Sequence, residues 1–140
     1  MYAIISDIHG NLEALQAVLA DIESQGISRI LCLGDVVGYG PDPGACVTLV
    51  RQRCELCLKG NHDVAVVLEP LGFNQVARSA AFWTKRELKP GWFAPRAKRL
   101  NWTFLQHLPE RHTEEGFLFV HGSPRDPAME YIEEADLMDV

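Results

Sequence analysis

The sequence predicts an α/β domain with parallel strands, and three observations lead to this prediction. The chain has 140 residues, which is the length of one ordinary domain. In its first part, short apolar runs typical of buried strands alternate with longer segments of helical periodicity. Each of these apolar runs is followed by a polar cluster that contains a glycine. Because ligands of α/β proteins bind at the carboxyl ends of the strands, the clusters indicate a functional site at one edge of the sheet.

The first strand, helix and strand are expected to form a βαβ unit. Residues 3–6 are an apolar run that ends at a carboxylate, and residues 29–33 are a second run of the same kind. Between them we expect a helix from its N-cap, Asn11, to Gly26, because apolar side chains recur there at helical spacing. These side chains are Leu12, Leu15, Val18, Leu19 and Ile22. A helix between neighbouring strands favours parallel strands and a right-handed crossover.

A second unit of the same kind follows. A loop rich in glycine and proline at residues 34–44 precedes a helix through residues 46–50 and a strand at residues 54–58. Cys54 and Cys57 form a C-x-x-C pattern, but side chains three positions apart on a strand point to opposite faces, which excludes chelation of one metal. The N-terminus does not resemble a signal peptide, so the sequence does not indicate an oxidising compartment. We therefore expect all four cysteines to be free thiols that behave as small apolar residues.

The remainder of the chain is predicted to be helical first and to end in a hairpin and a tail. Residues 64–110 are expected to form a helical insertion, interrupted where proline and glycine occur together. Residues 111–113 and 117–120 are expected to pair as a hairpin. Residues 126–140 carry six acidic residues and no basic ones, and a loop with a short helix is expected there. Residues 1–140 therefore form one predicted domain with a helical, basic insertion.

The composition excludes several classes of protein. The chain has 13 Lys and Arg against 19 Asp and Glu, a net charge of −6 at pH 7, and 47% hydrophobic residues. These are ordinary values for a folded domain and exclude a disordered or coiled-coil chain. No apolar run approaches the about 20 residues that cross a bilayer, and the N-terminus lacks the features of a signal peptide. We expect a cytoplasmic protein that does not contact membranes.

The charge is unevenly distributed along the chain. Residues 78–111, called the basic segment below, hold eight basic and two acidic residues together with half of the twelve aromatic residues. Such a mixture can attract and stack on phosphate-bearing rings, so a nucleic-acid-binding module is one alternative function. The negative charge of the whole chain opposes this alternative. Amphipathic helices with a solvated basic face account for the same pattern.

Four polar clusters carry the side chains that could bind metal ions. They comprise residues 7–11, residues 34–35, residues 60–63 and residues 121–123. Together they offer carboxylates, imidazoles and an amide oxygen, a mixture that suits Mn, Fe or Zn better than a thiolate site or a calcium cage would. Asp7 and His9 are two positions apart at a strand end, so both point to the same side and can bind one ion.

In their order and spacing, these clusters resemble the motifs of the calcineurin-like metallophosphoesterase superfamily, in particular its small bacterial and archaeal members. The motifs are D-x-H-G-N at residues 7–11, G-D-V-V-G-Y-G-P at residues 34–41, G-N-H-D at residues 60–63 and V-H-G-S-P at residues 120–124. The resemblance implies a sandwich of two mixed β-sheets flanked by helices. It also implies a site for two divalent metal ions at one edge.

The resemblance further implies a role for each motif residue. The implied metal ligands are Asp7, His9 and Asp35 for one ion and Asp35, Asn61 and His121 for the other, with Asp35 bridging the two. His62 would lie outside the metal shell and stabilise the phosphoryl charge or protonate the leaving group. Asp63 is expected to orient the His62 imidazole. The implied reaction is hydrolysis of a phosphomonoester or phosphodiester, on a small molecule or nucleotide, by a hydroxide that bridges the metals.

One motif of the family is missing from the sequence. Family members finish with a strand that carries G-H-x-H, whose histidines complete both metal shells, and nothing like it follows Val120. The sequence therefore predicts a C-terminally incomplete domain with three protein ligands for each ion. A non-catalytic or weakly active metal-binding partial domain, serving as a subunit or scaffold, is the main alternative function. An unfinished second sheet also favours a homodimer or a completing C-terminal segment as partner.

Overall fold

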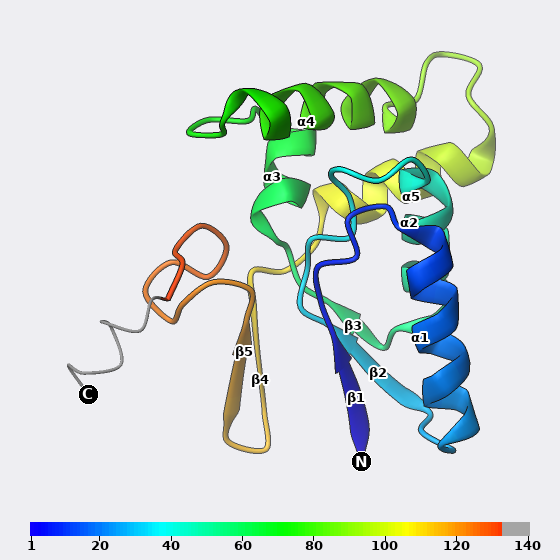
Figure 1. The fold of residues 1–140 in the computed structure, drawn as a ribbon, viewed down its shortest axis with the longest axis vertical. Helices are drawn as coiled ribbons and strands as arrows, with labels where there is room; N and C mark the ends of the chain where they lie inside the picture. The colour runs from blue at the N-terminus through cyan, green and yellow to red at the C-terminus, as the bar shows by residue number, and fades with distance from the viewer. Residues whose placement is uncertain (133–140) are drawn as a thin grey trace.

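Two β-sheets organise residues 1–132, the part of the chain that the computed structural model describes (Figure 1). The first sheet contains the parallel strands β1 (Tyr2–Ile5), β2 (Arg29–Cys32) and β3 (Leu56–Cys57), in that order. The second sheet is the antiparallel hairpin of β4 (Arg111–Glu114) and β5 (Phe117–Val120). The predicted α/β class with two sheets flanked by helices is confirmed. Within residues 1–132 one sheet is wholly parallel and the other is antiparallel.

Helix α1 (Leu12–Ser24) connects β1 to β2 and completes the predicted βαβ unit. The Asn11 side chain accepts a hydrogen bond from the Ala14 N–H and caps the helix, as predicted. Gly26, at a φ of +70°, lies in the left-handed conformation that ends helices. The predicted apolar spacing brings one side of α1 against the sheet, where Leu15, Leu19 and Ile22 are buried.

Helix α2 (Pro43–Arg53) connects β2 to β3. Strand β3 is shorter than the strand predicted at residues 54–58. The helix continues to Arg53, and Cys54 is its C-cap, so the chain becomes extended later than the sequence indicated. The segment still runs beside β2, because the Leu58 N–H donates to the Cys32 carbonyl. All four thiols are free, as predicted, and Cys54 is half-buried while the other three are buried.

The two faces of the first sheet are covered by different layers. Ile30 and Cys32 face the larger core, which α1 and α2 complete. Leu31, which alternates with them along β2, packs with Leu58 and with Phe119 of the hairpin. The Arg29 guanidinium also joins the layers, because it donates to Glu55 and to Glu114 of β4 at 2.8 Å. The parallel sheet therefore lies between helices on one side and the hairpin on the other (Figure 1).

Three helices occupy the segment between β3 and β4. They are α3 (Asn61–Val67), α4 (Gln75–Leu88) and α5 (Arg96–Gln106). Helix α3 starts at Asn61, so most of the G-N-H-D motif forms the first turn of a helix and not the strand-end loop that the sequence indicated. In Figure 1, α4 crosses above the carboxyl ends of the parallel strands. The helical segment therefore covers the edge at which the polar clusters lie.

The hairpin turn consists of Glu115 and Gly116, whose φ angles are +51° and +83°. Positive φ at both central residues is typical of the two-residue turns that join tightly twisted strands. A loop with a short helix is expected within residues 126–140; residues 126–132 contain no helix, and residues 133–140 lie outside the part that the structure describes. Among residues 1–132, no helix combines the length and apolar character needed to span a membrane.

Two cations of the basic segment donate hydrogen bonds to backbone carbonyls of the helical segment. Lys85 donates to the carbonyls of Val67 and Leu68, at the end of α3. Arg99 donates to the Trp92 carbonyl in the loop between α4 and α5. These contacts give the two cations a role in holding the helical segment together.

Candidate metal centre

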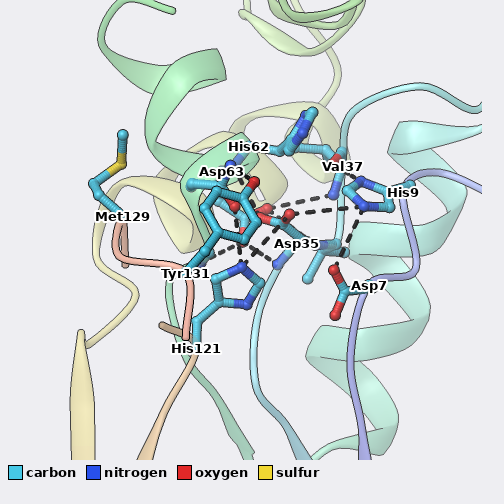
Figure 2. A network of polar contacts seen from close by, with 12 residues as sticks. Asp7, His9, Asp35, Val37, His62, Asp63, His121, Met129 and Tyr131 are labelled. Atoms are coloured by element: carbon cyan, nitrogen blue, oxygen red, sulfur yellow. Dashed lines mark hydrogen bonds and ion pairs between the residues drawn. The ribbon is translucent and has the colours of Figure 1, made fainter. Parts of the chain in front are cut away.

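The predicted ligands come together at the carboxyl end of the parallel sheet (Figure 2). The His9 Nε2 atom lies 3.6 Å from Asp7 Oδ1 and 3.7 Å from Asp35 Oδ2. On the other side of Asp35, the His121 Nε2 atom lies 3.6 Å from Asp35 Oδ2 and 3.0 Å from Asn61 Oδ1. Residues that follow β1, β2, β3 and β5 thus meet in one polar cluster.

Asp35 is the centre of this cluster and is only 2% exposed. Its Oδ1 atom accepts a hydrogen bond of 2.8 Å from the His62 N–H, so Oδ2 is left to face the two imidazoles of His9 and His121. Burial, together with the nearby Asp7 carboxylate, raises the pKa of Asp35 to about 7, although backbone N–H groups oppose the shift. A cation between these carboxylates would stabilise their charged forms.

Two sets of three side chains bring their donor atoms within 4.8 Å of one another. One set is His9, Asp35 and His62, and the other is Asp7, Asp35 and His121. Asp35 belongs to both sets, which is the position that the resemblance implied for a bridging ligand. The two sets differ from the predicted metal shells in two ways. The first set contains His62, which the sequence prediction kept outside the shell, so the geometry also permits His62 to be a ligand. The second set groups Asp7 with His121, whereas the prediction assigned Asp7 and His9 to the same ion.

The chemistry of the donor atoms fits divalent transition metals. The His9 Nδ1 atom lies 3.3 Å from the Val37 carbonyl, which can only accept, so its Nε2 carries no proton in the neutral ring and is free to bind an ion. Among the described residues, the Nδ1 atoms of His62 and His121 are buried without a hydrogen-bond partner. Buried polar atoms of this kind are normally satisfied by a partner. Imidazole and carboxylate together suit Mn, Fe or Zn.

Three of the predicted ligands have a strained backbone. Asp7, His9 and Asp35 have φ angles of +56°, +49° and +54°, in the left-handed region that residues other than glycine seldom occupy. Hydrogen bonds between the loops stabilise this conformation. The Asp7 N–H donates to the Gly34 carbonyl, and the His9 N–H donates to the Asp35 carbonyl. Strained residues of this kind cluster at functional sites.

The comparison with known proteins agrees with this geometry. The family model of the calcineurin-like phosphoesterases matches residues 2–139. The chain belongs to this family. The resemblance inferred from the motifs is therefore confirmed, and so is the fold that it implied.

Two relatives of this chain are considerably longer than it is. It is 43% identical over 139 residues to "Uncharacterized protein MJ0912" of Methanocaldococcus jannaschii, a match that covers 94% of this chain and 54% of that protein. The crystal structure of a metallophosphoesterase from Sphaerobacter thermophilus superposes with a TM-score of 0.77 at 41% identity, covering 98% of this chain and 53% of the other. The chain thus spans about half the length of these relatives.

A more distant structure shares the fold of this chain. The hypothetical protein PH1004 from Pyrococcus horikoshii OT3 superposes with a TM-score of 0.77 at 20% identity, covering 94% of this chain and 59% of the other. The fold is therefore retained where most of the sequence differs.

Asp63 does not orient His62, which corrects the sequence prediction. Its carboxylate oxygens accept hydrogen bonds from the backbone N–H groups of residues 35–37 and of Gly60, at 2.8 to 3.3 Å. Burial and the nearby Asp35 raise the pKa of Asp63 to about 7 against the effect of these donors. The reason for the difference is that Asp63 lies in the first turn of α3 and points to the loop after β2. Asp63 therefore holds the backbone that carries Asp35.

The His62 side chain is surrounded by rings. Its ring centre lies 4.7 Å from that of His9, 4.7 Å from that of Tyr39 and 4.8 Å from that of Phe73. Burial and the imidazoles of His9 and His121 lower the pKa of His62 to about 4. A neutral imidazole in this position can still donate one hydrogen bond through its N–H.

Three aromatic residues near the centre were missed by the sequence prediction. Tyr39 lies within the G-D-V-V-G-Y-G-P motif, which could have indicated it. Phe73 and Tyr131 have no such signal, because they approach the centre only through the packing of distant segments. Tyr131 contacts a predicted ligand directly, since the Asn61 side-chain amide donates to its hydroxyl at 3.3 Å.

Gly38 allows the loop after β2 to pass close to two imidazoles. Its φ is +143°, and a Cβ atom at this position would lie 2.8 Å from the His9 Nδ1 and 2.9 Å from the His62 Nδ1. Such distances are too short for any side chain. Glycine is therefore required here by both the backbone angle and the close approach.

Proposed function

We propose that this calcineurin-like phosphoesterase hydrolyses a phosphomonoester or a phosphodiester with two divalent metal ions bound around Asp35. Membership of the family supports a metal-dependent phosphoesterase. The observation that carries the two-ion proposal is that one buried carboxylate, Asp35, belongs to two sets of possible ligands. A shared carboxylate is typical of sites in which two ions lie about 3.5–4 Å apart.

The residues of the chain have separate tasks in this proposal. The ions are held by Asp7, His9, Asp35, Asn61 and His121. When bound, divalent ions supply a nucleophile at neutral pH and neutralise charge on the phosphoryl group. His62, beside the ligands, donates its N–H to a phosphoryl oxygen or to the leaving group. Asp63 keeps the Asp35 backbone in place through its hydrogen bonds.

Metal titration and an activity assay test this function together. Protein freed of metal with a chelator should take up two Mn²⁺ or Zn²⁺ ions per chain and gain hydrolysis of bis(4-nitrophenyl) phosphate. Asp21→Asn, a change on the exposed side of α1, is the matched control and should behave as the unchanged protein. Protein that binds no ion, or that binds ions without any hydrolysis of phosphomonoesters or phosphodiesters, would contradict the proposal.

The alternative proposal is a partial domain that binds metal weakly and needs a further segment for activity. It is supported by the relatives, because the chain spans about half of their length. A segment with a strand and G-H-x-H, fused after Val140 or added separately, should then raise metal affinity and activity together. Full activity of the 140-residue chain alone would contradict this alternative.

A further inference from the structure

Two adjoining cavities lie beside the metal centre, on the side of His62. The first has a volume of about 270 Å³ and is lined in part by Tyr39, His62 and Tyr131. The second has a volume of about 630 Å³ and lies along α3. Both include Asn61, Leu71, Phe73 and Met129 in their walls, so they form one groove that starts at the predicted ligands. Figure 2 shows Tyr131 beside these ligands and Met129 farther out.

The groove differs in chemistry from the metal centre. Its outer part is walled by aliphatic side chains of α3 and the following loop, namely Val64, Val67, Leu68 and Leu71. Its inner part is walled by rings, because Tyr39 and Phe73 both lie against His62. Among the described residues that line the two cavities, Glu69 is the only acidic one, and there is no Lys or Arg. The groove therefore suits an uncharged apolar group.

We propose that this groove binds the leaving group of the substrate and that this leaving group is an uncharged aromatic ring, as in an aryl or nucleoside phosphoester. The inference rests on the phosphoester hydrolysis proposed above. A phosphate at the metal centre would have His62 on one side, and the groove begins at His62. A leaving group on the His62 side of the phosphate would therefore enter the groove, where Tyr39 and Phe73 offer ring faces and edges. The second cavity, at about 630 Å³, is within the about 300–1,000 Å³ of ordinary ligand sites, and the first, at about 270 Å³, is just below this range.

The lack of cations in the groove narrows the substrate class further. A leaving group with a second phosphate or a carboxylate would find no basic side chain among the described lining residues to pair with it. Placing such a charge against aliphatic side chains without a partner is unfavourable. Phosphoesters whose only negative charge is on the reacting phosphoryl group are therefore preferred.

Binding of stable phosphonates tests the proposal without relying on turnover. The experiment is to measure the affinities of phenylphosphonate, methylphosphonate and inorganic phosphate for the Mn²⁺-loaded protein by titration calorimetry. Phenylphosphonate should bind at least about tenfold more tightly than methylphosphonate, the size of effect that one apolar group gains in a fitted pocket. A carboxylate added at the 4-position of the phenyl ring should remove this advantage.

Variants of the wall locate the effect in the groove. Leu71 is 74% exposed, so Leu71→Ala should fold normally and reduce the preference for phenylphosphonate while leaving the affinity for inorganic phosphate unchanged. Leu68→Ala, at another exposed wall position, should act in the same direction. Val76→Ala is the matched control, because Val76 is 72% exposed on α4 and lines neither cavity.

The outcomes separate this inference from the proposed function. Failure of the metal-loaded protein to bind inorganic phosphate would count against the proposed function itself. Binding of phosphate with equal affinities for phenylphosphonate and methylphosphonate would leave that function standing and overturn the groove proposal. Equal loss of preference in Leu71→Ala and Val76→Ala would also overturn it, because the effect would then not belong to the groove.

Discussion

At the scale of single residues, Asp35 is the side chain on which the candidate centre depends. It is buried between His9 and His121, and its backbone is held by the Asp63 carboxylate. The carboxylates of Asp7 and Asp35 and the imidazoles of His9 and His121 form an arrangement that a cation stabilises. The centre is therefore expected to lose its metal when the charge of Asp35 is removed.

We expect Asp35→Asn to lose both metal ions and nearly all hydrolysis of an aryl phosphodiester. The amide retains the shape of the side chain but removes the negative charge that two ions would share. The fold should survive, because the apolar core between the sheet and α1 and α2 does not involve this side chain. Elemental analysis of the purified variant measures the metal, and full occupancy would reject the bridging role.

We expect His62→Ala to retain its metal but to lose turnover by about 10²-fold to 10³-fold, the range for loss of one hydrogen-bond donor to charge that develops in the transition state, because burial keeps the His62 imidazole neutral. The reason is that His62 is predicted to act on the phosphoryl group and not on the ions. Metal content and kcat are measured on the same preparation. If metal is lost together with activity, His62 is a ligand, as its place in the set with His9 and Asp35 permits.

At the scale of elements, α4 holds the loop between β2 and α2 against the centre. Thr84 of α4 is fully buried, and its hydroxyl donates to the Gly38 carbonyl at 2.8 Å. Gly38 in turn lies against the imidazoles of His9 and His62. The helical segment therefore helps to position the site through one buried hydrogen bond. This role does not depend on its basic side chains.

Thr84→Val should lower the free energy of unfolding by about 1–3 kcal/mol. Valine has nearly the same shape, but it leaves the buried Gly38 carbonyl without its donor, and a buried unsatisfied group costs this amount. Urea unfolding measures the change. Ser79→Ala on the same helix is the control and should change stability little, because the Ser79 hydroxyl bonds to its own helix at an exposed position. Equal effects of the two changes would contradict the prediction.

At the scale of the whole molecule, apolar surface remains on the strands. Ile4 of β1 and Phe117 and Leu118 of β5 are exposed. Within residues 1–132, β1 pairs only with β2, and β5 pairs only with β4. Open strand edges and exposed apolar residues favour association with another chain.

We therefore expect the 140-residue chain to self-associate as its concentration rises. Phe117→Asp should shift the association to higher concentration, because it places a charge on the exposed strand. Val76→Asp adds the same charge to an exposed position on α4 and serves as the control. Light scattering over a range of concentrations measures the mass, and a monomer at every concentration would contradict the prediction.

The sequence by itself determined the order of the elements and the residues that gather at the site. Hydrophobic periodicity is local, so the first strands and α1 could be predicted from residues a few positions apart. Parallel strands bring their carboxyl ends to one edge, so the polar clusters around Asp7, Asp35 and Asn61 were expected to meet. His121 arrives instead from β5 of the antiparallel hairpin. The length of β3 was wrong, because no local signal shows that α2 continues to Arg53.

Only the tertiary structure decided how the side chains of the site are paired. Asp63 bonds to the Asp35 backbone across 28 positions of the chain, and His121 contacts Asn61 across 60. The left-handed backbone of Asp7, likewise, is held by a bond to the loop after the next strand. Contacts of this range depend on how layers pack and which rotamers fit. A local sequence pattern predicts which residues lie at the edge of the sheet, whereas the packing of the layers determines which of their atoms are in contact.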